Sequence, residues 1–500
     1  MAAPPLINNN HKAAVGSALH EYFLKAITVV SDWMWGPWTL VFIAVVSVFL
    51  TVRSGFFQVS HFAYIFRGSF GQIFDRSGDR NRERMTPFQA TSTSLAGTVG
   101  MGNMAGVATA LSIGGPGAIL WMWVLAFFGM MTKAVEITIA VHYRDIDAKD
   151  QVQGGPMYYI RRALGWRSLA VLFSIGIAFN SFFSSSMLQS HTVGRAFVAS
   201  YGIHPYITTG GMAVITAIVA IGGVRRIGRF CERLVPAMTL LYLVGGLIIV
   251  IANADQLPGV LSRIFTYAFA PAPAAGGFAG AAVMAAIQNG MARGMLSNEA
   301  GLGTAPMVHA NAETDHPFRQ GMWGAAEVFI DTTVMCSITA FIILSTGVLE
   351  NGQTGIELLI EAFSTYYSPE VAGAFVSIAI LTFCLSTQIG FFIYFQTALV
   401  DLFGERAFRY LRWIYFMPGI VFATITRTDE LWAVANISVF LSAIPNLVAL
   451  LMLSGVFLTL MRDYLSGEKK YATALIDVSR AWVRTAPGYR SERAPQSAGP

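Results

Sequence analysis

Long uncharged stretches alternate with short charged loops along most of the chain. A helix needs about 20 mostly apolar residues to span a bilayer. The uncharged run 85–132 is long enough for two spans, and a Gly-Gly-Pro-Gly turn at 114–117 divides it. The pattern predicts eleven transmembrane helices, at about residues 33–53, 86–112, 116–143, 165–199, 205–224, 233–253, 276–309, 320–349, 371–403, 407–426 and 430–462.

Lysine and arginine are distributed unevenly between the loops on the two sides of the membrane. With the N-terminus outside, 26 of the 33 Lys and Arg fall on the cytoplasmic side, five fall outside, and Lys133 and Arg293 lie within spans. Short cytoplasmic loops carry an excess of basic residues. We therefore predict a plasma (inner) membrane protein with an extracytoplasmic tail over 1–32, a transmembrane domain over 33–463 and a cytoplasmic tail over 464–500.

Composition excludes a soluble enzyme, because charged residues make up 12% of the 500 residues and hydrophobic residues 54%. Soluble domains carry about 25% charged residues. The three cysteines are too few for a disulfide framework and lack metal-ligand spacing. The net charge of +5 is explained by the basic loops rather than by a nucleic-acid partner. Asn8, Asn9 and Asn10 lie where a signal peptide would have its apolar core.

Two predicted spans contain residues that a continuous lipid-facing helix avoids. Span two includes GTVGMGN at 97–103, and span seven includes SNEAGLG at 297–303. Each glycine inside a helix costs about 1 kcal/mol relative to alanine, and unwound backbone in a bilayer needs cover from protein or a water-filled cavity. Close helix packing through small residues is the alternative explanation.

The positions of these two spans in the chain favour broken helices. With the first span set aside, two sets of five remain, 86–253 and 276–462, so the second set must cross the membrane in the opposite sense. Interrupted spans at corresponding positions of inverted halves are typical of transporter binding sites. We predict an all-α membrane protein with a 5+5 inverted repeat, one additional N-terminal helix, and breaks in spans two and seven.

Several segments resemble the alanine or glycine:cation symporter family. They are the stretch from Gln89 to Arg144, GGPMYYI at 154–160, RGMLSNEAGLGTAPMVHANAETDHPFRQG at 293–321 and AIPNLVALLMLSG at 443–455. The resemblance extends from Trp35 to Met461. It implies a LeuT-like fold and alternating-access uptake of a small neutral amino acid, alanine or glycine, coupled to sodium.

The break in span two offers groups for both ends of a zwitterionic amino acid. Backbone amides at the start of its second half suit a carboxylate, and the carbonyls near 96–99 suit an ammonium group or sodium. Glycines at 100 and 102 allow the ligand to approach the backbone. We expect the substrate to contact Thr98, Gly100, Gly102, Asn103, Gln189, Gln288, Leu296 and Phe391.

The resemblance to LeuT-like proteins also implies a sodium site between spans two and nine. Its expected ligands are Ala96, Val99, Cys384, Ser386 and Thr387. Cys384 can contribute only its carbonyl oxygen. The alternative for the two hydroxyl groups is hydrogen bonding to the preceding helical turn. Asn103 suits either a second ion or the substrate carboxylate.

Four positions depart from the family pattern. Leu296 replaces a usual Phe and Phe391 a usual Trp, while His191 and Gln388 alter two other motifs. The smaller residues leave room for a larger side chain, so both alanine or glycine and a larger neutral amino acid remain open.

Ionisable residues within spans are functional candidates by default, because burying charge in a bilayer is costly. Arg293 and Glu299 flank the break in span seven and are expected to pair. Glu327 and Asp331 lie one turn apart in span eight. Lys133 is expected to pair or to extend towards the membrane surface.

Two further functions remain open. Proton coupling through Glu299 or His191 is an alternative to sodium coupling. An ion channel is the alternative of another class, since Asn and Gly breaks also build selectivity filters. Clustered nucleophiles or metal ligands of an enzyme are absent from the sequence pattern.

The basic-residue distribution makes the orientation testable. A reporter fused after Pro500 should be active when it requires the cytoplasm and inactive when it requires export. Paired cytoplasmic and exported reporters at this position provide the measurement. Activity of the exported reporter alone would contradict the orientation.

Overall fold

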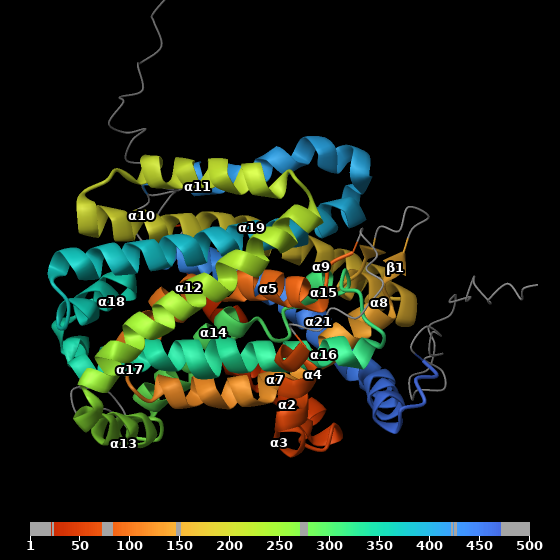
Figure 1. The fold of residues 1–500 in the computed structure, drawn as a ribbon, viewed down its shortest axis with the longest axis horizontal. Helices are drawn as coiled ribbons and strands as arrows, with labels where there is room; N and C mark the ends of the chain where they lie inside the picture. Colours follow the sequence, from red (N-terminus) through yellow and green to blue (C-terminus); the bar gives the residue numbers. More distant parts are fainter. Residues whose placement is uncertain are drawn as a thin grey trace, which may run out of the picture.

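The computed structural model describes residues 22, 25–72, 84–146, 152–270, 279–421, 424 and 428–471. Within them almost every residue is helical, which confirms the predicted all-α class. The long helices lie side by side, with α10 and α11 along one edge and α2 to α4 near the opposite one (Figure 1). The α-helices of the first half are α2 (Pro37–Arg53), α3 (Phe57–Ser60), α4 (Phe62–Gly68), α5 (Pro87–Thr98), α6 (Val107–Gly114), α7 (Ala118–His142), α8 (Pro156–Ala163), α9 (Arg167–Asn180), α10 (Leu188–Tyr201), α11 (Pro205–Ala220), α12 (Val224–Ala252) and α13 (Leu257–Tyr267).

The second half contains α14 (Ala279–Asn298), α15 (Ala305–His309), α16 (Pro317–Val328), α17 (Ser337–Thr346), α18 (Gly355–Ser364), α19 (Pro369–Leu411), α20 (Pro418–Val421) and α21 (Thr428–Ser466). Three π-helical turns, Gly102–Gly106, Ser181–Met187 and Phe329–Cys336, join consecutive helices. Short 3-10 helices lie at Phe70–Gln72, Ala254–Gln256, Val348–Asn351 and Arg412–Phe416. The one sheet in the described residues pairs β1 (Asp145–Ile146) with β2 (Val152–Gln153) in antiparallel fashion.

Local sequence explains where the first broken span begins. Thr86 caps α5 by accepting a hydrogen bond from Gln89 N, and the Gln89 side chain bonds back to Thr86 N. This reciprocal cap satisfies two N–H groups that a helix start leaves free. Pro87 at the first helical position needs no hydrogen-bond partner.

Seven helical runs in the described residues are long and apolar enough to cross a membrane. They are Lys25–Arg53, Ala118–His142, Arg167–Tyr201, Val224–Ala252, Pro317–Thr346, Pro369–Val421 and Leu431–Ser466. The shorter helix Pro205–Ala220 is also apolar. The chain is thus a multi-pass membrane protein, while the number eleven stays a prediction.

Spans two and seven are both broken, as predicted. Helix α5 ends at Thr98, and helical structure resumes at Met101. Helix α14 ends at Asn298, and α15 starts at Ala305. The first half of each span packs against the second half of the other, α5 against α15 and α6 against α14. The two broken spans therefore run antiparallel, as inverted halves require.

The predicted end of span nine at 403 agrees with the structure. Within α19 the backbone of Gly404 is not helical, with φ 79° and ψ 166°, so the helix is interrupted one residue after the expected end. A short helical segment to Leu411, a 3-10 helix and the short α20 follow, so the described part of 407–426 is not one helix. The positive φ of Gly404 favours glycine and lets the chain change direction here.

Glycines let α16 pack closely against α7. A Cβ at Gly321 would lie 2.1 Å from Thr138 Oγ1, and one at Gly324 would lie 2.4 Å from Ile137 Cδ1. Small residues permit such approach between membrane helices. The contact fixes the position of Lys133, whose Cγ would lie 3.1 Å from a Cβ at Gly324.

Candidate functional site

Two side chains cap the backbone amides at the break in span two. Gly100 N donates to Asn103 Oδ1 at 3.0 Å, and Met101 N donates to Gln189 Oε1 at 3.1 Å. In a continuous helix Gly100 N would instead bond to the carbonyl of Ala96, four residues earlier. The break therefore releases a carbonyl oxygen that the sequence analysis assigned to sodium.

π-Helical turns place the polar residues around this break. Asn103 lies within the turn Gly102–Gly106, Asp331 lies within Phe329–Cys336, and Gln189 follows Ser181–Met187 by two residues. A π-turn inserts one extra residue into a helix, and such turns occur frequently at functional sites. The insertion changes which side chains face the break, and this change is not visible in a regular helical pattern.

Asp331 belongs to this site, although the sequence analysis named it only as an ionisable residue within a span and not as a ligand. Its Oδ1 lies 2.8 Å from Asn103 Nδ2, and its Oδ2 accepts a hydrogen bond from Ser297 Oγ at 2.7 Å. Asn103 Nδ2 is also 3.1 Å from Ser297 Oγ. Asp331, Asn103 and Ser297 are almost completely buried. The signal that points to Asp331 is its charge within a span, and the three residues connect the breaks of spans two and seven.

Helix α19 approaches α5 closely enough to bring Thr387 to the break. A Cβ at Gly390 would lie 3.1 Å from Thr93 O, so only glycine permits this crossing without displacement. Thr387 Oγ1 lies 3.5 Å from Val99 O and donates to Phe383 O at 3.0 Å. The arrangement places a hydroxyl and a carbonyl oxygen side by side.

The other expected sodium ligands on α19 have different surroundings. Ser386 Oγ donates to Phe383 O at 2.8 Å and lies 3.5 Å from Met238 Sδ on α12. This is the hydrogen bond to the preceding turn that the sequence left open. Cys384 is fully buried.

The remaining predicted substrate residues lie at different depths. Thr98 ends α5 and donates to Leu95 O at 3.3 Å. Phe391 is buried one turn after Thr387, with its ring 4.8 Å from that of Tyr394. Leu296 is half-buried beside the break in span seven. Gln288 lies ten residues before the end of α14, about 15 Å along the helix, and is not brought to the break.

Gln388 faces away from the break. Its Nε2 lies 2.6 Å from Ser190 Oγ and 3.1 Å from Ser186 O, and its Oε1 accepts from Thr216. This departure from the family pattern therefore concerns packing between spans nine, four and five.

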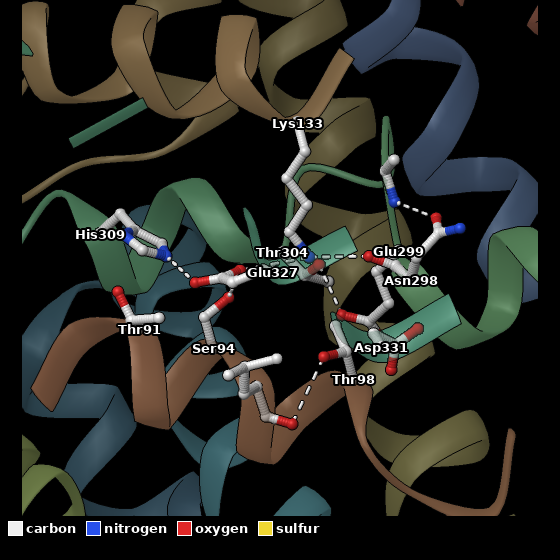
Figure 2. A network of polar contacts seen from close by, with 12 residues as sticks. Thr91, Ser94, Thr98, Lys133, Asn298, Glu299, Thr304, His309, Glu327 and Asp331 are labelled. Carbon is white, nitrogen blue, oxygen red and sulfur yellow. Dashed lines mark hydrogen bonds and ion pairs between the residues drawn. The ribbon is translucent and has the colours of Figure 1, made fainter. Parts of the chain in front are cut away.

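A second polar network lies next to the break in span seven (Figure 2). Lys133 Nζ donates to Asn298 O at 2.7 Å and lies 3.7 Å from Glu327 Oε2. Glu327 also bonds to His309 at 2.7 Å and to Ser94 at 2.9 Å. All five residues are buried. Of the two expectations for Lys133, the structure confirms pairing inside the protein and not extension towards the membrane surface.

The two ionisable residues expected to pair in span seven have separate partners. Glu299 Oε2 accepts a hydrogen bond from Thr304 Oγ1 at 2.7 Å. The Arg293 guanidinium lies over the Trp432 ring, 3.7 Å from its centroid. The pairing prediction is wrong in this structure, because six residues along a helix do not bring two side chains to one face.

Two cavities flank the broken spans on opposite sides. One of about 650 Å³ is lined by residues that include Ala105, Thr109, His191, Arg293 and Trp432, beyond the break in span two. The other, of about 350 Å³, is lined by residues that include Tyr158, Arg225, Met307, Asn311 and Gln396, around α15. The break with its polar groups lies between them.

The donor set suits a monovalent cation and an ammonium group. It comprises backbone carbonyls, the Thr387 and Ser297 hydroxyls and one carboxylate, Asp331. Hard cations prefer such oxygen ligands. Within the described residues, no group of three or more His, Cys, Asp or Glu could hold a metal ion.

Antiparallel broken spans in a multi-pass helical membrane protein define a secondary transporter. The model of the sodium:alanine symporter family matches residues 20–477. The chain belongs to this family. It is accordingly a cation-coupled amino acid symporter and not an enzyme.

Similar proteins cover almost all of the chain. It is 36% identical to the sodium/alanine symporter AgcS of Methanococcus maripaludis, over 87% of this chain and 95% of that protein. It is 34% identical to the probable sodium/glutamine symporter GlnT of Bacillus subtilis, over 89% and 91%. The crystal structure of a manganese transporter of Eremococcus coleocola shares the fold, with a TM-score of 0.53 and 14% identity over 79% of this chain and 86% of that one.

The contact between the two breaks predicts that Gly102 tolerates no side chain. A Cβ there would lie 3.2 Å from Ser297 Cα. Gly102→Ala should push the breaks apart, at a cost of about 1–3 kcal/mol, and abolish binding of every amino acid. Binding of an amino acid panel to the purified protein provides the measurement.

Gly106→Ala is the matched control, because its Cβ would meet only Met101 O, at an ordinary 3.7 Å. This variant should bind as the unmodified protein does. Equal binding by both variants would contradict the role of Gly102.

Proposed function

We propose that the protein takes up a small neutral amino acid together with sodium by alternating access. The observation that carries the proposal is the meeting of two antiparallel breaks, where Asn103, Ser297 and Asp331 contact one another beside the released backbone groups of span two. Unwound backbone within a membrane is tolerated only where it is buried in protein or lines a water-filled cavity.

The substrate carboxylate is proposed to bind the amides that begin the second half of span two. Helix N-termini favour anions through the free N–H groups and the helix dipole. Asn103 and Gln189 now occupy two of these amides, at Gly100 and Met101. The substrate would exchange with these side chains, which then orient it. Asp331 provides the negative charge for the substrate ammonium.

Sodium is proposed to bind between span two and span nine. Val99 O and Thr387 Oγ1 are the supporting pair, 3.5 Å apart. The carbonyl oxygens of Ala96, which the break releases, and of Cys384 complete the proposed set of ligands. The Ser386 hydroxyl now donates to Phe383 O, and its oxygen would bind sodium after the side chain rotates away from that carbonyl.

The two cavities support alternating access. We assign the cavity beyond the break in span two to the outer side and the cavity around α15 to the cytoplasmic side. This orientation follows from the proposed outside N-terminal tail (1–32) and cytoplasmic C-terminal tail (464–500). The repeats 86–253 and 276–462 would move relative to each other within the transmembrane domain 33–463.

Uptake of radioactive alanine into proteoliposomes tests the proposal. An imposed sodium gradient should drive saturable uptake, whereas a channel would show conductance without substrate. Thr387→Ala should raise the sodium concentration for half-maximal uptake by roughly 10- to 150-fold, because a polar contact to a charged group is worth about 1.5–3 kcal/mol.

Two variants control this measurement. Thr387→Ser keeps the oxygen and should retain the original sodium dependence. Thr382→Ala removes a hydroxyl that bonds only within α19 in the described structure and should also retain it. Unchanged sodium dependence in Thr387→Ala would move the ion elsewhere.

Leu296 and Phe391 favour a second candidate substrate, a larger neutral amino acid such as glutamine. Both lie next to the breaks and are smaller than the usual family residues. Phe391→Trp with Leu296→Phe should favour glycine and alanine over larger substrates by roughly 10–200-fold, the value of one or two methylenes of pocket space. Competition of unlabelled amino acids against alanine uptake measures the ratio. Equal weakening for all substrates would place both residues outside the pocket.

A further inference from the structure

His309 and Glu327 form a buried pair that the proposed sodium symport does not use. His309 Nε2 lies 2.7 Å from Glu327 Oε1, and both side chains are fully buried. On the other side of the ring, Gln320 Nε2 lies 2.7 Å from His309 Nδ1. An amide nitrogen can only donate, so Nδ1 accepts and Nε2 carries the proton donated to Glu327.

Gln320 provides the second observation. Its Oε1 is buried and has no hydrogen-bond partner among the described residues. Rotation of the amide by half a turn would bring this oxygen to Nδ1, and then both ring nitrogens could donate. The site can therefore accept one more proton without any backbone movement.

The pair connects the cytoplasmic halves of both broken spans. Glu327 on α16 bonds to Ser94 on α5 at 2.9 Å and to His309 at the end of α15. A proton added at His309 converts a neutral contact with Glu327 into an ion pair. The strength of the His309–Glu327 contact then depends on whether His309 is protonated. The difference is large because electrostatic interactions are stronger in a buried region of low dielectric.

Several charged and titratable groups lie around the pair. Lys133 on α7 lies 3.7 Å from Glu327, while Glu299, Asp331, Glu136 and Tyr394 lie in the same polar region, on α14–α15, span eight, α7 and α19. Arg144 donates to the carbonyl oxygen of Ala310, next to His309, at 2.9 Å. Because Lys133 already lies beside Glu327, a proton at His309 would add a second cation to the same carboxyl group.

We propose that His309, Glu327 and Gln320 form a proton-binding site that sets the pH dependence of transport, separately from the sodium site. The transport measurement rests on the proposed function, whereas proton binding itself does not. The site predicts that internal pH changes the uptake rate at fixed sodium gradient and fixed membrane potential.

Proton binding is measured directly by nitrogen NMR of 15N-histidine-labelled protein in nanodiscs, without substrate. One histidine signal, absent in His309→Gln, should change from the pattern of a neutral ring to that of a doubly protonated ring as the pH is lowered. Gln320→Met removes the acceptor for the second proton and keeps the His309–Glu327 contact. It should move the midpoint to lower pH by about one unit, a tenfold loss of proton affinity. Failure of the His309 signal to titrate would overturn the proposal.

Transport provides the second readout. Internal pH should alter alanine uptake by the unmodified protein, while His309→Gln should give a flat profile. His142→Gln is the matched control, because it removes another buried histidine, at the end of α7 and outside this site, and its profile should follow the unmodified one. A profile that persists in His309→Gln, or disappears in His142→Gln instead, would overturn the proposal. Absence of any sodium-driven uptake, with His309 titrating normally, would refute the proposed function alone.

Discussion

The structure depends on one constraint: every polar group released by a helix break inside a membrane needs a partner. A peptide N–H or C=O left without one in hydrocarbon costs several kcal/mol. The chain contains two such breaks and places them against each other, with Gly102 at Ser297. Asn103 and Gln189 accept hydrogen bonds from the amides of Gly100 and Met101, and Asn298 O accepts one from Lys133 Nζ. Polar side chains on neighbouring spans are therefore required for the fold as well as for transport.

Under the proposed function, the same constraint would link binding to conformational change. The side chains that cap free backbone groups in this structure are the ones that a ligand at the break would replace. Asn103 bridges Gly100 N on one side and Asp331 on the other. A ligand that engages either partner changes the connection between the two inverted halves. The coupling follows from shared hydrogen-bond partners rather than from distance.

Sequence periodicity predicts the class of fold, because apolar length and glycine clusters report directly on membrane spans and their breaks. It predicts neither the depth of Gln288 nor the role of Asp331. Gln288 lies in the same polar, glycine-containing stretch of sequence as the break in span seven, yet it is about 15 Å away from the end of α14. Each residue of a helix adds about 1.5 Å along the axis, so ten residues separate the two positions by this distance. Asp331 reaches Asn103 through two π-helical turns, whose extra residues do not follow the ordinary period of 3.6. Span nine shows the simpler case, in which Gly404 interrupts the helix one residue after the end that charge content predicts.

Close glycine contacts determine which charges become partners. Gly321 and Gly324 allow α16 to approach α7 closely. The Lys133 side chain is therefore buried between the helices, where it lies beside Glu327. Glu327 then holds α5 through Ser94 and α15 through His309, although these residues are far apart in the chain. Removing one member of such a buried group leaves the others uncompensated, and this cost exceeds the net value of the intact pair. The network consequently links α5 and α15, one half of each broken span, while Asn103 and Gln189 at the break in span two have partners outside it. Under the proposed function, this separation would let the helices keep their contacts through Glu327 while the side chains at the break exchange with a substrate.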